Sequence, residues 1–156
     1  MTASDICLTS LDDFVAVAQP TLERALVARF GLQDGMEAAA DALAYGCSDW
    51  ERLRTLRNPV GYLFRVGESK AKRRNRRRRH LVVLTDATST TDTPLDVDLQ
   101  RALMRLKPEQ RVAIVLVHAH GHTYAEAAAL MDAPVTTITN HINRGLTRLR
   151  RLLEER

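Results

Sequence analysis

Residues 123–153 read TYAEAAALMDAPVTTITNHINRGLTRLRRLL, and they contain the clearest structural pattern in the chain. Thr123, followed three positions later by Glu126, fits a capping box that starts a short Ala-rich helix. The Asp-Ala-Pro sequence at 132–134 breaks that helix, and a longer helix is expected over residues 135–155. A short capped helix, a tight break and a longer helix form the outline of a helix-turn-helix.

The longer helix of this motif has two different faces. On one face, apolar residues recur every three or four positions and predict burial: Val135, Ile138, Ile142, Leu146, Leu149 and Leu153. On the other face, short polar and basic side chains can reach phosphates and base edges in a major groove: Thr136, Thr137, Thr139, Asn140, Asn143, Arg144 and Thr147. An amphipathic helix in an ordinary bundle has the same apolar spacing. The capped start, the break and the polar face therefore favour DNA binding over a bundle helix.

A basic run lies far from this motif in the sequence. Between Lys70 and Arg79, eight of ten residues are Lys or Arg and none is acidic, although the net charge of the whole 156-residue chain is only +4. Such clustering suggests a polyanionic partner such as nucleic acid. A solvated, self-repelling tail and a targeting signal are the alternatives.

The N-terminal half of the chain has a helical pattern from residue 11 to residue 79. It begins with an apolar stripe at helical spacing: Leu11, Phe14, Val15, Ala18, Leu22 and Leu26. A Gly-containing break is expected at 31–35, an Ala-rich helix over 38–45 and a basic loop over 52–57. The Asn-Pro pair at 58–59 is a strong helix start, and this helix should continue into the basic run.

A polar, low-complexity segment at residues 85–93 separates the two halves of the chain. Further helices are expected after it, over 95–106 and 108–119. The sequence therefore predicts an all-α protein with two small helical domains joined by a flexible linker. The expected division is 1–84 for the first domain, 85–94 for the linker and 95–156 for the second domain.

Composition narrows the class of protein further. Hydrophobic residues make up 45% of the chain but aromatic residues only 4%, so the core must consist of Ala, Leu and Val, which favours helix. Cys7 and Cys47 form no CxxC motif and are too few for a disulfide framework, which fits a reduced, cytoplasmic setting. There is no long apolar stretch, so we expect no signal peptide, no transmembrane helix and no membrane partner.

Three histidines alternate around Gly121: His118, His120 and His122. Their spacing by two spreads them around a helix end, and no Cys or acidic ligand is adjacent, so no metal site is expected. The sequence shows no nucleophile–base pair, no phosphate-binding Gly loop and no paired carboxylates. An enzyme, a cofactor and a small-molecule substrate are therefore not expected.

Residues 103–153 resemble the C-terminal domain of extracytoplasmic-function sigma factors. The parts follow that family's order: a Leu-rich lead-in, Pro-x-x-Arg before an apolar helix, Gly-x-Thr-Tyr-x-Glu, Thr-Ile-x-x-x-Ile-x-Arg and a tail rich in Leu and Arg. The stretches EAAADALAYGCSDWERL (37–53) and NPVGYLFRVGESKAKRRNRRRR (58–79) are similar to the family's other domain. The resemblance implies a transcription initiation factor that binds core RNA polymerase and directs it to double-stranded promoter DNA.

The resemblance also implies roles for individual residues. The upstream (minus-thirty-five) element would be read by Thr137, Thr139, Asn140, His141 and Arg144, beside Thr136 and Asn143 on the same face. Thr123 and Tyr124 would lie at a phosphate, and Glu37 and Asp41 would face the polymerase clamp. At the downstream (minus-ten) element, a flipped base and the nearby phosphates would be held by Arg54, Arg57, Asn58, Lys70, Lys72, Arg73, Arg74, Arg76 and Arg77.

Some positions depart from the family pattern. The family often has Gln where this chain has Ala40 and usually has Asn where it has Ser69; the turn usually has Gly in place of Asp132, and Lys and Arg are common in place of Thr139 and His141. These departures keep open a sigma-like adaptor that docks without melting DNA. A stand-alone helix-turn-helix regulator is the other alternative, although no receiver domain precedes the motif. The family often has an anti-sigma factor that masks both domains, so such a partner is a further expectation.

Overall fold

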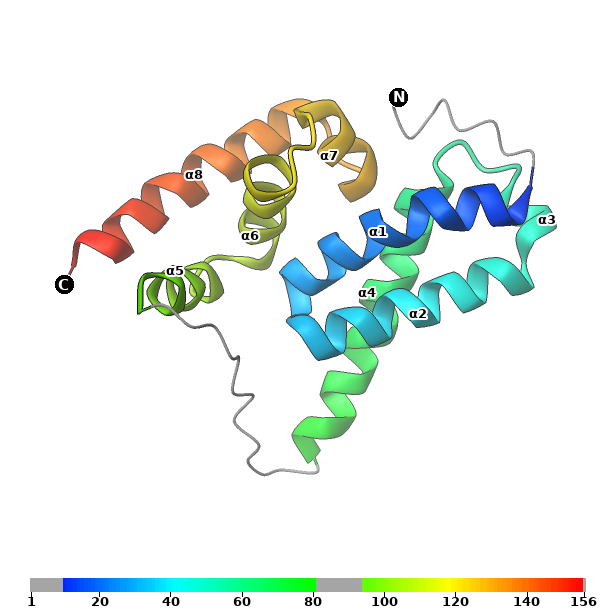
Figure 1. Cartoon of the computed structure of the whole chain (residues 1–156), viewed down its shortest axis with the longest axis horizontal. Coiled ribbons are helices and arrows are strands. Elements are labelled where there is room, and N and C mark those ends of the chain that lie inside the picture. Colours follow the sequence, from blue (N-terminus) through cyan, green and yellow to red (C-terminus); the bar gives the residue numbers. More distant parts are fainter. Residues whose placement is uncertain (1–9, 81–93, 156) are drawn as a thin grey trace.

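The structure is a computed structural model that describes residues 10–80 and 94–155, of which 77–80 and 94–96 are described by their backbone alone (Figure 1). Within these ranges the chain forms helices and no strands, which confirms the predicted all-α class. Most of the predicted linker, 85–94, lies outside the described residues. The elements are α1 (Leu11–Phe30), α2 (Leu32–Ser48), α3 (Trp50–Leu53), α4 (Pro59–His80), α5 (Pro94–Met104), α6 (Pro108–Ile114), the π-helical turn η1 (Val115–Ala119), α7 (Tyr124–Met131) and α8 (Val135–Glu154).

Helices α1 and α2 pack side by side and run in opposite directions (Figure 1). They are joined at Gly31, whose φ of +92° favours glycine. The predicted break over 31–35 is wrong beyond Gly31, because α2 begins at Leu32. Gly35 lies inside α2, where a Cβ would overlap the backbone of Val27 in α1. This glycine therefore lets the two helices touch rather than separating them.

Helices α3 and α4 complete the N-terminal unit. The short α3 replaces the start of the predicted basic loop, so that the loop before α4 is reduced to residues 54–58. The Oδ1 atom of Asn58 accepts a hydrogen bond from the Gly61 amide at 3.1 Å, and Asn58 therefore caps α4 as the sequence predicted. In the core beneath, the ring of Trp50 lies against that of Phe14, with 5.4 Å between the ring centroids.

The C-terminal unit contains the helix-turn-helix, formed by α7 and α8. The predicted capping box is present: the Thr123 hydroxyl accepts a hydrogen bond from the Glu126 amide at 3.1 Å, and the Glu126 carboxylate accepts one from the Thr123 amide at 3.3 Å. Asp132 ends α7 in the left-handed conformation, with φ 50° and ψ 52°. The break predicted at 132–134 therefore turns the chain sharply into α8.

Helix α8 is buried only along the middle of its predicted apolar face. Ile138 and Ile142 are almost completely buried. At the two ends, however, Val135 is 47% exposed and Leu153 is 39% exposed. The prediction of one continuous buried face is therefore wrong at both ends. At the C-terminal end the reason is that this half of α8 extends beyond α6 and α7 (Figure 1).

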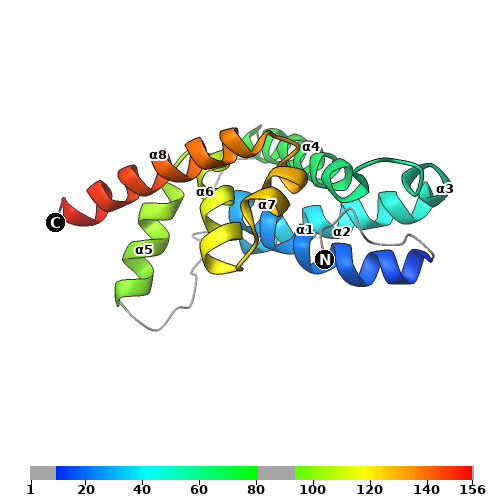
Figure 2. The same ribbon diagram turned by 90° about the horizontal axis from the view of Figure 1, so that it is seen from above.

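The two helical units pack against each other, α1 against α6 and α4 against α7 (Figure 2). Arg111 of α6 lies at the centre of this contact and is only 6% exposed. Its Nε atom donates to the carbonyl oxygen of Ala28 and its Nη2 atom to that of Arg29, both at 2.6 Å, at the end of α1. Its Nη1 atom donates to the Leu106 carbonyl oxygen at 3.4 Å, within its own unit. Burial lowers the pKa of the Arg111 guanidinium, and these carbonyls compensate for the lost hydration.

Candidate nucleic-acid interface

The polar face of α8 points away from the protein interior. The side chains of Thr136, Asn140, Asn143 and Arg144 are exposed, and all four lie on the face for which the sequence predicted DNA contact. Glu154, at the last turn, is the only acidic residue within α8. An exposed helix with Thr, Asn and Arg side chains and almost no negative charge matches what a major groove requires.

Three other predicted reading residues are less available. Thr137, Thr139 and His141 are half-buried rather than exposed. The Thr139 hydroxyl donates to the Val135 carbonyl oxygen at 3.0 Å, so its one proton is already used within the helix. Thr139 keeps its oxygen lone pairs and its methyl group for a base edge, but it cannot donate without giving up this bond.

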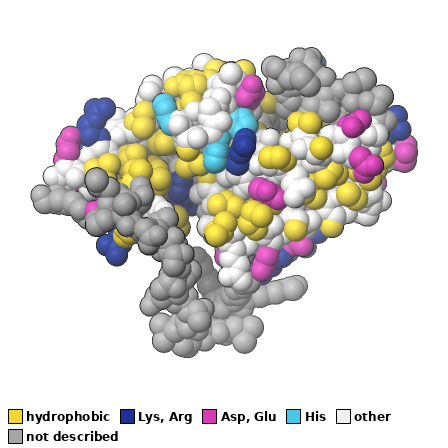
Figure 3. Space-filling model, viewed as in Figure 1, with side chains coloured by type: hydrophobic (Ala, Val, Ile, Leu, Met, Phe, Trp, Pro, Cys, Tyr) yellow, Lys and Arg dark blue, Asp and Glu magenta, His cyan; other side chains and the backbone are white. Residues whose placement is uncertain are grey.

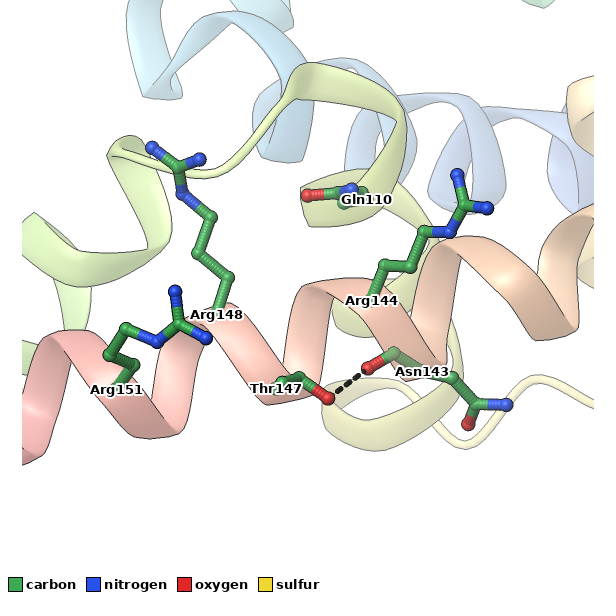
Figure 4. A pocket seen from close by; sticks show the side chains of 6 residues that line it. All are labelled: Gln110, Asn143, Arg144, Thr147, Arg148 and Arg151. Carbon is green, nitrogen blue, oxygen red and sulfur yellow. Dashed lines mark hydrogen bonds between the residues drawn. The ribbon is translucent and has the colours of Figure 1, made fainter.

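Arginines on the second half of α8 line an open pocket of about 420 Å³ beside α6 (Figure 4). In Figure 4, Arg144 and Arg148 extend on either side of Gln110. Arg151 completes the basic side of the pocket, and no acidic residue lines it. Three cations grouped around one open space without a carboxylate attract an anion the size of a phosphate.

Gln110 lies at the base of this pocket and is only 8% exposed. Its Oε1 atom is buried without a hydrogen-bond partner in the protein. No pattern in the sequence singles out Gln110, because its place in the pocket depends on the contact between α6 and α8.

The predicted phosphate contact at the start of α7 combines an exposed and a half-buried residue. Thr123 is exposed and its hydroxyl accepts from Glu126, which leaves the hydroxyl proton available to an incoming phosphate. Tyr124 is half-buried and packs against the core, so it supports the helix start more than it reaches outward.

A second candidate surface is the loop before α4. Arg57 and Asn58 line a pocket of about 190 Å³ together with Tyr62 and Arg65 of α4. Asp132, from the turn between α7 and α8, closes one side of this pocket and forms an ion pair with Arg65. The loop predicted to hold a flipped base is therefore already in contact with the other helical unit. The remaining predicted residue of the loop, Arg54, is exposed and pairs with Glu51 at 3.8 Å.

The basic run on α4 is not uniformly available to DNA. Arg73 and Arg76 are exposed. Lys70 lies over the ring of Tyr45, with 5.7 Å between Nζ and the ring centroid, and Lys72 pairs with Glu68 at 3.7 Å. The side chain of Arg77 lies outside the described residues.

Arg74 connects two predicted sites that the sequence analysis treated as separate. Its guanidinium donates to the carboxylates of Glu37, at 2.7 Å, and of Asp41, both on α2. Arg74 was predicted to track phosphates and the two acids to face the polymerase. In the structure they form one ion-pair cluster, so Arg74 braces α4 against α2 instead of pointing freely into solvent.

The three histidines around Gly121 do not form a metal site. Among the described residues, no group of three His, Cys, Asp or Glu side chains could hold a metal ion. The Nδ1 atom of His122 lies 3.3 Å from the Glu126 carboxylate, beside the capping box. Burial lowers the pKa of His120, and the nearby Arg24 and His122 lower it further.

The described side chains on the face drawn in Figure 3 are acidic and basic ones scattered among hydrophobic ones (Figure 3). They do not form a second concentrated basic surface like the arginine-lined pocket beside α8.

Comparison with known proteins agrees with this geometry. A family model described as "Sigma-70, region 4" matches residues 96–149, the segment that contains the helix-turn-helix. The fold is similar to that of the sigma factor RpoE of Bartonella quintana, solved in complex with the anti-sigma factor NepR. The two chains are 23% identical, the TM-score is 0.67, and the likeness covers 92% of this chain and 96% of that one. No curated protein sequence matches the chain.

Residues 96–149 thus match a sigma-70 region 4 domain, and the chain has the fold of a solved sigma factor. Both findings support the predicted class, a transcription initiation factor of the extracytoplasmic-function sigma type. None of the helices in the described ranges combines the length and the low polarity that crossing a bilayer requires.

Proposed function

We propose that the exposed face of α8 reads the upstream promoter element and that the adjoining arginine pocket holds a backbone phosphate. The observation that carries this proposal is the combination of exposed Thr136 and Asn140 with the pocket of Arg144, Arg148 and Arg151. Amide side chains such as that of Asn140 can pair with a base edge, whereas grouped guanidiniums suit phosphates. Arg144 shares the pocket with the other two arginines, which favours a phosphate contact for it over base readout.

We further propose that the loop before α4 binds the downstream element and that Glu37 and Asp41 mark the side of α2 that docks on core RNA polymerase. Arg57 is exposed beside a pocket that contains the Asn58 amide and the Tyr62 ring, a chemistry that suits a stacked and hydrogen-bonded base. The half-exposed carboxylates of α2 supply a negative patch for a basic partner surface. The exposed Arg73 and Arg76 would follow the phosphates between the two sites.

The partners follow from this arrangement. Because RpoE was solved with an anti-sigma factor bound, we propose that an anti-sigma factor also controls this chain. Transcription takes place where DNA and polymerase are, so a cytoplasmic location is proposed as well.

The decisive experiment reconstitutes transcription from purified chain and core polymerase on a library of promoter fragments. We expect transcripts that start at a defined subset of fragments and that need both components. The Asn140→Ala variant tests the reading role in the same assay. Because this side chain is exposed, the variant should stay folded but produce transcripts from a different subset of fragments. If the chain binds core polymerase and duplex promoter but no thymine becomes permanganate-reactive, the adaptor alternative is supported instead. If it binds duplex DNA without any affinity for polymerase, the stand-alone regulator is supported.

A further inference from the structure

We propose that the arginine-lined pocket beside α8 also binds a free ligand: a small phosphate monoester with a hydrogen-bond donor close to its phosphate. A phosphorylated sugar, either free or as part of a nucleotide, has this chemistry. Such a ligand is distinct from promoter DNA. Only its competition with the promoter backbone rests on the proposed function of the pocket.

The size and the charge of the pocket suit a small phosphorylated molecule. Its volume is about 420 Å³, and small-molecule sites in proteins usually measure about 300–1,000 Å³. Arg144, Arg148 and Arg151 line it and are all exposed, and no acidic residue lines it. Guanidiniums that share one open space attract a doubly charged phosphate monoester more strongly than a singly charged diester.

The base of the pocket carries an acceptor that a backbone phosphate cannot satisfy. Gln110 is only 8% exposed, and no donor among the described residues reaches its buried Oε1 atom. Figure 4 shows the amide between Arg144 and Arg148, with its oxygen on the side of Arg148. A buried acceptor without a donor is unfavourable. Because a phosphodiester has neither an O–H nor an N–H group, DNA backbone in this pocket would leave Oε1 unpaired.

A hydroxyl group of the ligand would supply the missing donor. The nearby Thr147 hydroxyl already donates to the Asn143 carbonyl oxygen at 2.9 Å, so it cannot donate to Gln110 as well (Figure 4). The last torsion of a Gln side chain has broad energy wells, which lets Oε1 turn toward an incoming donor. Since the hydroxyls of a sugar phosphate lie a few bonds from the phosphate, one molecule can reach both the guanidiniums and Gln110.

Close packing of α8 on α6 holds Gln110 in place. Gly145 of α8 is buried against α6: a Cβ on it would lie 2.5 Å from the Cδ1 atom of Ile114 and 3.2 Å from the Cβ atom of Gln110. The two helices therefore approach this closely because Gly145 has no side chain. The pocket thus combines an acceptor fixed by packing with exposed cations that can adjust to a ligand.

The first test compares three probes by isothermal titration calorimetry on the full chain. At a pH of about 7.5, ribose 5-phosphate and ethyl phosphate both carry nearly two charges, but only the sugar has hydroxyl donors. Dimethyl phosphate reproduces the diester of a DNA backbone. We expect ribose 5-phosphate to bind about ten-fold more tightly than ethyl phosphate, the effect of one hydrogen bond to a buried acceptor, and dimethyl phosphate to bind most weakly. Equal affinities for the two monoesters would overturn the proposal.

Variants then assign the binding to the pocket. Gln110→Leu removes the acceptor at similar volume and should stay folded by circular dichroism, because the replaced oxygen had no partner. It should make the affinities for ribose 5-phosphate and ethyl phosphate equal, whereas Arg148→Ala should weaken both several-fold. The matched control is Arg150→Ala, which removes the same charge from an exposed position of α8 outside the pocket and should change neither affinity. A sugar preference that survives in Gln110→Leu, or equal losses in the two arginine variants, would contradict the site.

Two further measurements identify the ligand and its effect. Tighter binding of adenosine 5′-monophosphate than of ribose 5-phosphate would assign the site to nucleotides, and equal binding would assign it to sugar phosphates. Saturating ribose 5-phosphate should weaken the binding of a promoter duplex more than an equal concentration of ethyl phosphate does. If ribose 5-phosphate binds through Gln110 without displacing the duplex, the ligand site stands and the proposed role of the pocket in DNA binding fails.

Discussion

At the scale of single residues, the proposed DNA interface of α8 combines two chemistries: an amide that can read a base and arginines that can bind a phosphate. Asn140 lies on the exposed face outside the arginine pocket, where an amide can distinguish one base pair from another. Arg148 lies in the pocket with Arg144 and Arg151, where charge matters more than sequence.

These two residues should therefore respond differently to removal. Arg148→Ala should weaken binding to all promoter sequences by a similar factor and reduce the slope of log K against log salt by about 1, whereas Arg148→Lys should keep that slope. Asn140→Ala should cost about 1–3 kcal/mol on the preferred promoter and relax the preference at one position. Salt titrations on a matched and a mismatched duplex measure both effects. An unchanged slope in Arg148→Ala would remove the pocket from the DNA interface.

Asn58 shows which contacts of a single residue can be predicted from the sequence and which cannot. The Asn-Pro pair predicts the start of α4 correctly, because capping is a local interaction between residues three apart. The second hydrogen bond of the same amide reaches Ala129, 71 positions further along the chain. No local pattern can predict it, because it depends on how the two units pack. Arg111 was likewise visible only as part of a motif, and nothing in its neighbours indicated that it would bind the end of α1.

At the scale of elements, α4 carries a basic run in which some side chains are exposed and another is ion-paired to a neighbouring helix. Arg73 and Arg76 are exposed, whereas Arg74 is held by Glu37 and Asp41 of α2. The sequence predicted the helix and its charge, but a run of like residues contains no information about which of them faces a neighbouring helix.

Variants in this run should separate the two roles. Arg73→Ala combined with Arg76→Ala should lower the salt slope of DNA binding by about 2 with little change in stability, since both side chains are exposed. Arg74→Ala should instead lower the stability of the N-terminal unit, because two carboxylates on α2 lose their shared partner. Thermal unfolding and salt titration of both variants check this. A loss of DNA affinity in Arg74→Ala, without a loss of stability, would contradict the bracing role.

Helix boundaries illustrate what decides the elements themselves. The break was expected at 31–35, but only Gly31 interrupts the helices. Gly35 lies within α2, where it permits a close contact with α1 instead of forming a turn. Glycine has both uses, and sequence alone does not say which applies. The capping box of α7 was predictable in full, because both of its hydrogen bonds lie within four consecutive residues.

At the scale of the whole molecule, Arg111 connects the two helical units through hydrogen bonds to both of them. Its guanidinium is buried and satisfied by carbonyls from α1 and from the end of the α5 segment. Arg111→Ala would leave those carbonyls without their donor and a cavity between α1 and α6.

We therefore expect Arg111→Ala to lower the free energy of unfolding by about 3 kcal/mol or more, a value typical of a lost buried charge-assisted network. Arg105→Ala, at an exposed position, should change it by less than about 0.5 kcal/mol. Urea unfolding followed by circular dichroism measures both. Equal stability of the two variants would mean that the guanidinium contributes no more than a surface side chain.

The cluster of Arg74 with Glu37 and Asp41 makes two proposed binding events interdependent. If a phosphate draws the guanidinium away, the two carboxylates lose the counter-charge of Arg74 and become stronger acceptors for a cationic docking surface. Thermodynamic linkage then requires the converse with the same factor: a protein that binds the carboxylates releases the arginine toward the nucleic acid. One side chain would thus let promoter and polymerase recruit each other without any change in the backbone.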